Sequence, residues 1–318
     1  MIKKEYKVLG IKCIKFVGIL LIADLVFGTV SKELFFSQET GKYARSSYAI
    51  NEVETDILVF GSSHAHRHYI PEVFEKNLQN TAYNVGAEGQ QLLYHTAMQK
   101  MILKRTTPAL IILNIDGNFL YKSPAAYDRL SDLHPYYSDN KDELRPILGL
   151  QSKFIDFKLF FKAYQTNSTL IHAIRYYASP QLDYQGYRPL SGTMKPSEDN
   201  IYGKNEKGDD YIEEIDENFL NAFKEFIENA KKHQVKLAMV TSPSLNEVDY
   251  SQNASMIMMK EIAKEENIPF IDFYNSEPFK FNHLLFHDVT HLNNKGANMF
   301  TKRLTDTIKT KGLISDTN

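Results

Sequence analysis

Five short apolar segments alternate with helical segments along this chain of 318 residues, and this alternation limits the possible folds more than any other feature. Amphipathic stretches such as QLLYHTAMQKMILKR and NKGANMFTKRLTDTIKT separate the apolar runs. Strands joined through helices pair in parallel and are covered on both faces. The sequence therefore predicts an α/β fold, three-layer α/β/α, around a central, mostly parallel five-stranded sheet. The five predicted strands are DILVF (56–60), AYNV (82–85), ALIILNI (109–115), KLAMVTS (236–242) and PFIDF (269–273).

Polar loops follow three of these strands, and in parallel sheets ligands gather where loops leave the carboxyl ends of the strands. The loop GSSHAHRH begins a helix with Ser63, whose hydroxyl is a weak nucleophile unless a base activates it. In FHDVTHLN, Asp288 and His291 are spaced so that the carboxylate can hold one imidazole nitrogen and leave the other free. Each residue also has a plainer interpretation, because Ser63 and Asp288 could be helix caps and His291 an interior histidine.

Taken together, these loops resemble the signature blocks of the SGNH or GDSL hydrolases, in the order that the family has them. FGSSH carries Gly-x-Ser with Ser63 in the nucleophile position, and YNVGAEG carries Asn-x-Gly with Asn84 and Gly86. IDGNF keeps Asn118 of the third block, and Asp288 with His291 forms the last block, Asp-x-x-His. The resemblance covers about residues 56–120 and 217–308. Two departures are Ser62, where the family usually has aspartate, and DGNF, which lacks the leading glycine and the trailing aspartate.

The resemblance implies a role for each matching residue. Ser63 would attack an ester carbonyl, His291 would take its proton and return it to the leaving group, and Asp288 would orient His291. The backbone N–H groups of Ser63 and Gly86, with the Asn118 amide, would bind the oxyanion. No cofactor is expected. The residues expected to line the substrate pocket are His64 and Asn84.

Three alternating histidines allow a different interpretation of the first loop. The spacing of His64, His66 and His68 could bring imidazoles together on zinc. A third-ligand carboxylate with matching local spacing is missing, and Glu72 is a weak candidate. The sequence therefore favours no metal site, with His64 beside the nucleophile and with His66 and His68 at the solvent or the helix surface.

The N-terminus predicts a membrane segment. Lysines precede Val8–Val30, whose 23 residues could reach about 34 Å as a helix, enough for a bilayer if Lys12 and Lys15 snorkel. Asp24 is the objection, because a carboxylate at depth costs about 2.5 to 3.5 kcal/mol. A cleaved signal peptide is the alternative, but no clear cleavage site follows the apolar run. We expect residues 1–30 to be an uncleaved single-pass anchor, with the bulk of the chain outside the cytoplasm, or secreted or periplasmic if the segment is cleaved.

Beyond the anchor, residues 31–55 read as a polar stalk and residues 56–318 as the catalytic domain. An insertion at about 119–215 has an irregular pattern and is too long for an ordinary connection. It is predicted to be a lid or a substrate insertion. Its many tyrosines, with Arg188, could stack on sugar rings and hold a polar or anionic group, or could form a mixed aromatic sub-core.

Charge balance excludes one class of partner. The 37 lysines and arginines nearly match the 39 aspartates and glutamates, so no global field would draw the chain to nucleic acid. The leading hypothesis is a membrane-anchored, extracytoplasmic serine esterase or O-acyltransferase that acts on acyl groups of a cell-envelope polysaccharide through an acyl-enzyme. Its expected partners are an acylated glycan or other ester, the membrane, and a membrane-bound acyl donor. The alternative is a non-catalytic SGNH-fold scaffold or a carbohydrate-binding protein in envelope glycan assembly.

Overall fold

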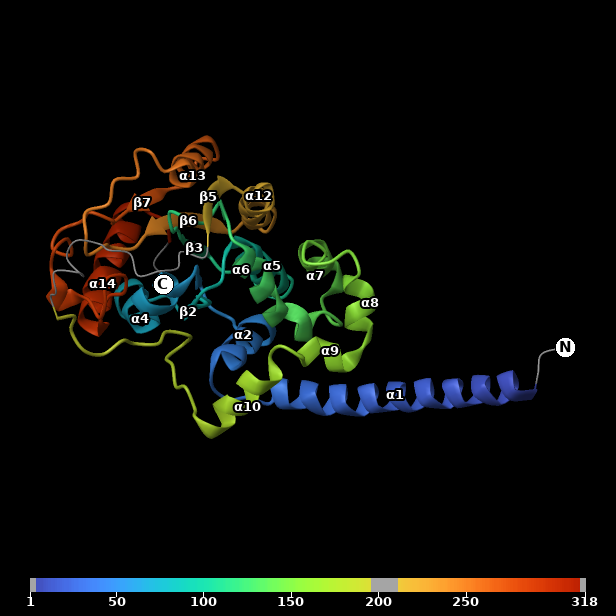
Figure 1. The fold of residues 1–318 in the computed structure, drawn as a ribbon. Coiled ribbons are helices and arrows are strands. Elements are labelled where there is room, and N and C mark those ends of the chain that lie inside the picture. Colours follow the sequence, from blue (N-terminus) through green and yellow to red (C-terminus); the bar gives the residue numbers. More distant parts are fainter. Residues whose placement is uncertain (1–3, 196–210, 315–318) are drawn as a thin grey trace. The chain divides into compact units, whose positions relative to one another are not determined.

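The central sheet of this computed structural model, which describes residues 4–195 and 211–314, is parallel throughout (Figure 1). Its strand order is β2-β1-β3-β6-β7. The predicted α/β class and the predicted parallel sheet are therefore confirmed, and each observed strand lies inside a predicted apolar run. The strands are β1 (Ile57–Phe60), β2 (Ala82–Asn84), β3 (Leu110–Asn114), β6 (Lys236–Thr241) and β7 (Phe270–Asp272).

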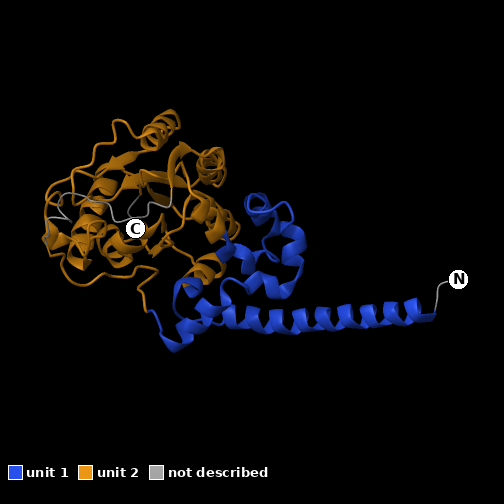
Figure 2. Cartoon of the chain, in the orientation of Figure 1, with its two compact units in different colours: residues 1–44, 130–181 blue, residues 45–129, 182–318 orange. Residues whose placement is uncertain are grey.

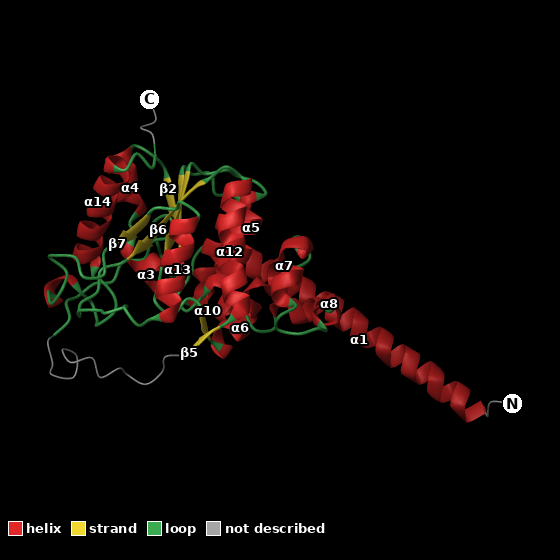
Figure 3. Cartoon of the chain, turned by 90° about the horizontal axis from the view of Figure 1, so that it is seen from above, coloured by secondary structure: helices red, strands yellow, loops and turns green. Residues whose placement is uncertain are grey.

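Alternation of side chains along the strands builds a core on each face of the sheet. Ile57 and Val59 of β1 join a buried cluster with residues of α4 (Pro71–Leu78) and α14 (Asn294–Thr310). Phe60 packs edge to face on Phe226, which belongs to α12 (Glu217–Lys232), and α12 lies against α5 (Leu92–Leu103). Figure 3 shows the strands between these two helix groups. Successive strand residues face opposite layers, as a pleated strand requires.

Side-chain caps fix the start of several helices around the sheet. Asp216 accepts the N–H of Asn218 at the start of α12, and Asn293 accepts the N–H of Gly296 at the start of α14. Asn253 caps α13 (Ala254–Glu265), which contacts β7. Asp and Asn are favoured at this position because they satisfy an N–H that has no partner within the helix.

The insertion after β3 is present, but its described part is built mainly of short helices rather than irregular chain. A two-residue strand, β4 (Tyr121–Lys122), pairs antiparallel with β5 (Ile212–Ile215) near the two ends of the insertion. Residues 196–210 of the predicted insertion, with Tyr202, lie outside the described residues. The helices among the described residues between β4 and β5 are α6 (Pro124–Arg129), η1 (Leu130–Tyr136), α7 (Lys141–Leu148), α8 (Ile155–Phe160), α9 (Lys162–Thr166) and α10 (Leu170–Ala178).

The chain divides into two compact units (Figure 2). Unit 1 contains residues 1–44 and 130–181, and unit 2 contains residues 45–129 and 182–318. Unit 2 carries the sheet. In unit 1, Phe35 of α1 (Lys4–Phe36) is fully buried, and its ring centroid lies 4.9 Å from that of Tyr43. The predicted stalk is largely helical and contributes buried side chains, because α1 continues through Phe36 and α2 (Lys42–Asn51) follows.

Helix α1 is long and apolar enough to cross a membrane. Most of its side chains up to Ala23 are exposed, whereas Gly28, Ser31 and Phe35 are buried along one stripe. Asp24, at the start of that stripe, accepts the backbone N–H groups of Lys162 (2.9 Å) and Ala163 (3.1 Å) at the beginning of α9. The carboxylate that argues against a membrane span therefore has two hydrogen-bond donors from the insertion.

Candidate active site

The loop after β1 turns sharply to place two serines at the carboxyl edge of the sheet. Gly61 has a φ of +139°, and a Cβ on it would lie 2.8 Å from the Asn114 Cβ and 2.9 Å from the Ala65 Cβ, so the turn requires glycine. Ser62 then precedes α3 (Ser63–His68), and Ser63 is its first residue. Local geometry thus presents the Ser63 hydroxyl at the sheet edge where ligands of parallel sheets bind.

Ser63, His291 and Asp288 form one continuous hydrogen-bonded chain. His291 Nε2 lies 2.9 Å from Ser63 Oγ, and His291 Nδ1 lies 3.0 Å from Asp288 Oδ2. The same carboxylate also accepts the backbone N–H groups of Thr290 (2.9 Å) and His291 (2.8 Å). Burial opposes ionisation of Asp288, but the hydrogen bonds and the charge of His291 prevail and hold its pKa below the usual range. With the proton on Nδ1 facing the carboxylate, Nε2 is free to accept the serine proton, an assignment made from the hydrogen-bond partners.

A second histidine, next to Ser63 in the chain, is held between two acceptors. His64 Nδ1 lies 2.6 Å from Asp116 Oδ1, and His64 Nε2 lies 3.1 Å from the backbone oxygen of Thr290. A carboxylate and a carbonyl can only accept, so both ring nitrogens donate and the ring is an imidazolium. Burial lowers the pKa of His64, but the charge and hydrogen bond of Asp116 outweigh it, and the pKa is raised above 6.5. His64 thereby ties α3 to the loop that carries His291.

Asp116 is the centre of this second network. It is buried, and besides His64 it accepts hydrogen bonds from Ser62 Oγ and from Asn114 Nδ2 (3.0 Å). Burial raises the pKa of Asp116, whereas the His64 charge and the three hydrogen bonds lower it, and the net result is a lowered pKa. Asp116 is therefore a carboxylate with a cationic partner, and the Ser62 hydroxyl is directed at it rather than at a base.

A hollow of about 340 Å³ opens over these residues, all within unit 2. It brings together four of the residues that the sequence selected, Ser63, His64, Asn118 and His291. Among the described tyrosines of the predicted insertion, Tyr211 is the one that lines this hollow. The rest of the lining consists of residues that sequence reasoning did not select for the site, all with polar side chains except Gly89: Ser62, Gly89, Gln90, Gln91, Asp116, Ser123, Arg129 and Thr290.

Three predicted residues do not line this hollow: Asp288, which contacts His291, and also Asn84 and Gly86. The Asn84 side chain is buried, and its Nδ2 donates to the backbone oxygens of Ala65 (2.7 Å) and Tyr69 (2.8 Å), so it braces α3 rather than lining a substrate pocket. The Gly86 N–H donates to Asn84 Oδ1 at 2.9 Å, so this N–H already has an acceptor inside the fold. This contact corrects the prediction of Gly86 as an oxyanion donor. The second glycine of the same loop, Gly89, lines the hollow with a φ of +72°. Sequence reasoning selected Gly86 and missed Gly89, because the loop conformation that distinguishes the two glycines cannot be read from the letters GAEGQ.

The other two histidines of the opening loop are interior groups rather than surface groups, which corrects that prediction. His66 and His68 are fully buried. His68 Nε2 accepts the backbone N–H of Leu292 at 2.9 Å, so it supports the segment next to His291. Burial lowers the pKa of His66 to about 4, and that of His68 lies well below 6.5. Across residues 4–195 and 211–314, no three His, Cys, Asp or Glu side chains gather in a way that could hold a metal ion.

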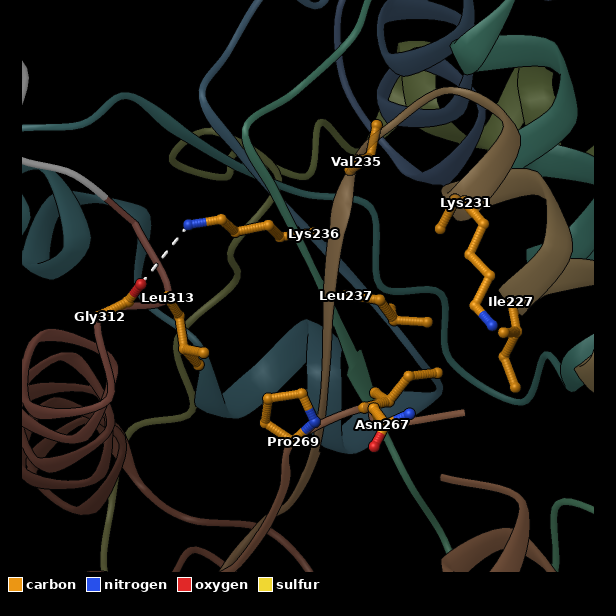
Figure 4. A pocket seen from close by; sticks show the side chains of 11 residues that line it. Ile227, Lys231, Val235, Lys236, Leu237, Asn267, Pro269, Gly312 and Leu313 are labelled. Carbon is orange, nitrogen blue, oxygen red and sulfur yellow. Dashed lines mark hydrogen bonds between the residues drawn. The ribbon is translucent and has the colours of Figure 1, made fainter. Parts of the chain in front are cut away.

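A further hollow in unit 2 lies at the amino end of β6, around Lys236 (Figure 4). Lys236 Nζ donates to the Gly312 backbone oxygen at 3.5 Å across it. Among the described residues that line this hollow, none carries a hydroxyl, imidazole or carboxylate. Its ionisable side chains are those of Lys231 and Lys236, without the serine, histidine and carboxylate that line the first hollow.

Comparison with known proteins gives distant matches. The sequence matches no protein-family model and no curated relative. A crystal structure from Bacteroides fragilis described as a "putative acylhydrolase" is similar at 14% identity and a TM-score of 0.40, covering 83% of this chain and 89% of that one. A structure from Streptococcus pneumonia described as a "putative platelet activating factor" is similar at 12% identity and a TM-score of 0.40, covering 93% of this chain and 98% of that one.

Proposed function

We propose that this chain is a serine esterase or O-acyltransferase of the SGNH type, with Ser63 as nucleophile. The observation that carries the proposal is the chain of contacts from Ser63 Oγ to His291 Nε2 (2.9 Å) and from His291 Nδ1 to Asp288 (3.0 Å). A serine, a histidine with one nitrogen free, and a carboxylate on the other nitrogen constitute the arrangement that activates a hydroxyl for acyl transfer.

The reaction proceeds in two balanced halves. Ser63 Oγ bonds to the ester carbonyl carbon as its proton passes to His291 Nε2, which gives a tetrahedral oxyanion. The bond to the leaving oxygen then breaks, that oxygen receives the proton from His291, and an acyl-Ser63 ester remains. The oxygen of water or of a sugar hydroxyl next bonds to the acyl carbon and gives its proton to His291. The bond from that carbon to Ser63 Oγ then breaks, and His291 returns the proton to Oγ. Asp288 stabilises the imidazolium in each half because its pKa is held low.

The oxyanion requires donors next to Ser63. We assign this role to the backbone N–H groups of Ser63 and Gly89 and to the side-chain amide of Asn118. The lining of the hollow by Gly89 and Asn118, together with Ser63, supports the assignment. Gly89 replaces Gly86 in this proposal because the Gly86 N–H already donates to Asn84.

The proposed substrate class is supported by the side chains that line the hollow and by the proposed membrane anchoring through α1. Gln90, Gln91, Asn118 and Arg129 make the hollow polar, which suits a hydroxyl-rich glycan better than a long acyl chain. We propose that α1 anchors the chain in a membrane with unit 2 outside the cytoplasm, so that the reaction modifies acyl groups of an envelope polysaccharide. As a transferase, the chain would receive its acyl group from a membrane-bound donor. The contacts of Asp24 and Gly28 favour an uncleaved anchor, because cleavage after the apolar run would remove both residues from the start of α9.

A fluorophosphonate probe tests the nucleophile. We expect labelling of the wild-type chain, no labelling of Ser63→Ala and reduced labelling of His291→Ala. Ser62→Ala is the matched control, since Ser62 is adjacent but points at Asp116, and it should still be labelled. A folded wild-type chain that resists the probe would support the non-catalytic scaffold instead. Measuring acyl release with and without a glycan acceptor then separates hydrolysis from transfer.

A further inference from the structure

Helix α8 of unit 1 exposes an aromatic face. Phe154, Phe157 and Phe160 are exposed to 59%, 68% and 71%. Their spacing of three residues places them on one side of the helix, and Ile155 and Leu159 are buried on the other. The Phe157 and Phe160 rings both pack edge to face on Phe161, with centroids 5.4 Å and 5.5 Å apart. Exposed apolar groups this large, gathered on one short segment, mark an interaction surface rather than ordinary surface variation.

Lysines flank this aromatic face. Lys153 and Lys162 are exposed at its two ends, and Lys158 lies between them. The Lys153 ammonium lies 5.3 Å from the centre of the Phe154 ring. Rings that enter the headgroup region, with lysines that reach lipid phosphates, are the composition of segments that lie in a membrane interface. A protein partner would not need the lysines to rim the rings in this way.

Contacts with α1 fix the level of this face along the anchor. The backbone N–H groups of Lys162 and Ala163, directly after α8, bind the Asp24 carboxylate. One turn later, a Cβ on Gly28 would lie 2.4 Å from Lys162 Cβ, so glycine permits the close approach of α9. Figures 1 and 3 both place α8 at the end of the insertion helices nearest to the N-terminal half of α1. Because α8 ends at Phe160, two residues before Lys162, the aromatic face lies near the level of Asp24.

The depth of Asp24 follows from the length of the apolar run. A hydrocarbon core of about 30 Å takes about 20 helical residues, and the run ends at Val30 before Lys32. Asp24 precedes Val30 by six residues, which is about 9 Å along the axis. A carboxylate at that level needs donors, and the first turn of α9 supplies two. The segment that brings these donors must itself enter the interface.

We propose that the aromatic face of α8 docks into the outer-leaflet interface of the same bilayer that α1 spans, with Lys153, Lys158 and Lys162 on lipid phosphates. The proposal rests on the proposed anchoring by α1. It gives unit 1 a second membrane contact besides the helix. The C-terminal half of α1, α8 and α9 then form one membrane-seated body that fixes the depth of the anchor.

The chain contains no tryptophan, so a single introduced tryptophan reports its own surroundings. The full-length chain would be reconstituted into phosphatidylcholine vesicles with bromine either near the carboxyl end or in the middle of the acyl chain. Phe157→Trp should lose most of its emission, more with the shallow bromines than with the deep ones. Phe16→Trp, in the apolar part of α1, reports insertion of the anchor. Phe281→Trp is the matched control, because Phe281 is 63% exposed beside a lysine but belongs to unit 2, and it should keep its emission.

Each other outcome contradicts the proposal in a recognisable way. Quenching of Phe16→Trp without quenching of Phe157→Trp would leave the anchor in place and overturn docking. No quenching of either would overturn the anchoring as well. Equal quenching of Phe157→Trp and Phe281→Trp would remove the special role of α8. A blue-shifted Phe157→Trp emission that depends on protein density and not on bromine would show that a second copy covers the face.

Discussion

Two adjacent serines at the edge of the sheet each meet an aspartate and a histidine, but in a different order. From Ser63 the contacts run to His291 and then to Asp288. From Ser62 they run to Asp116 and then to His64. In the first set the histidine separates serine and carboxylate, and in the second the carboxylate separates serine and histidine. Only the first order lets an imidazole nitrogen take the serine proton.

The same three residue types therefore serve two purposes. His291 can cycle between neutral and charged forms because one nitrogen faces a hydroxyl that both donates and accepts. His64 is fixed as a cation because both nitrogens face acceptors, Asp116 and the Thr290 oxygen. The first set suits proton transfer, and the second holds α3 and the loop that carries His291 together. The residue types alone therefore do not distinguish a set suited to proton transfer from one that stabilises the fold.

Exchange of each serine gives the largest predicted difference between the two sets. Ser63→Ala should lower kcat for ester hydrolysis by about 10⁶, since loss of a triad nucleophile removes the covalent route. Ser62→Ala should change kcat by less than about tenfold, because it removes one hydrogen bond to Asp116. Steady-state hydrolysis of p-nitrophenyl acetate measures both variants, with thermal unfolding as the folding control. An equal loss of kcat in Ser62→Ala would contradict the assignment of Ser63 as the nucleophile.

The two aspartates should separate activity from stability. Asp288→Asn should lower kcat by about 10⁴, because an amide cannot hold the productive tautomer or stabilise the imidazolium. Asp116→Asn should instead lower the free energy of unfolding by about 3 kcal/mol, since it leaves the His64 cation without its charged partner. Kinetics and urea unfolding of both variants would test the contrast. A Asp116→Asn variant with unchanged stability would contradict the bracing role.

Two asparagines extend the comparison to oxyanion binding. Asn118→Ala should lower kcat by about 10² to 10³ with little change in KM, the effect expected for one lost oxyanion donor. Asn84→Ala should lower Tm, because the buried amide donates twice and accepts once within the fold. Kinetics and thermal unfolding distinguish the two. A Asn118→Ala variant with a raised KM and an unchanged kcat would place Asn118 in ground-state binding.

The sheet and the Ser63, Asp288 and His291 chain could be predicted because their signals are local. Continuous apolar runs located β1, β3 and β6 to within about two residues, the usual uncertainty of an element boundary. Asp288 and His291 are three residues apart, so one turn brings them together. Parallel strands then bring the loop after β1 and the loop before α14 to one edge.

What could not be predicted depends on partners distant in the sequence. The Asp24 carboxylate binds backbone N–H groups 138 and 139 residues away, which no pattern around Asp24 reveals. The choice of Gly89 over Gly86 depends on loop conformation, and the burial of His66 and His68 depends on packing across α3. Asp116 lies in DGNF, whose departure from the family block obscured its pairing with His64.

A pH titration of stability sharpens the contrast between the histidines. The pKa of His64 in the folded chain is raised above 6.5. Its contribution to the free energy of unfolding is therefore complete below pH 6.5 and is lost as the pH rises through the folded pKa. The pKa of Asp116 in the folded chain is lowered. Its contribution to the free energy of unfolding is therefore present above the ordinary aspartate pKa of about 3.9 and is lost as the pH falls through the folded pKa. The Tm difference between wild type and His64→Gln should therefore be largest between about pH 4 and 6.5 and shrink at higher pH. Thermal unfolding across this range measures it, and a difference that does not vary with pH would mean that His64 is not held as a cation.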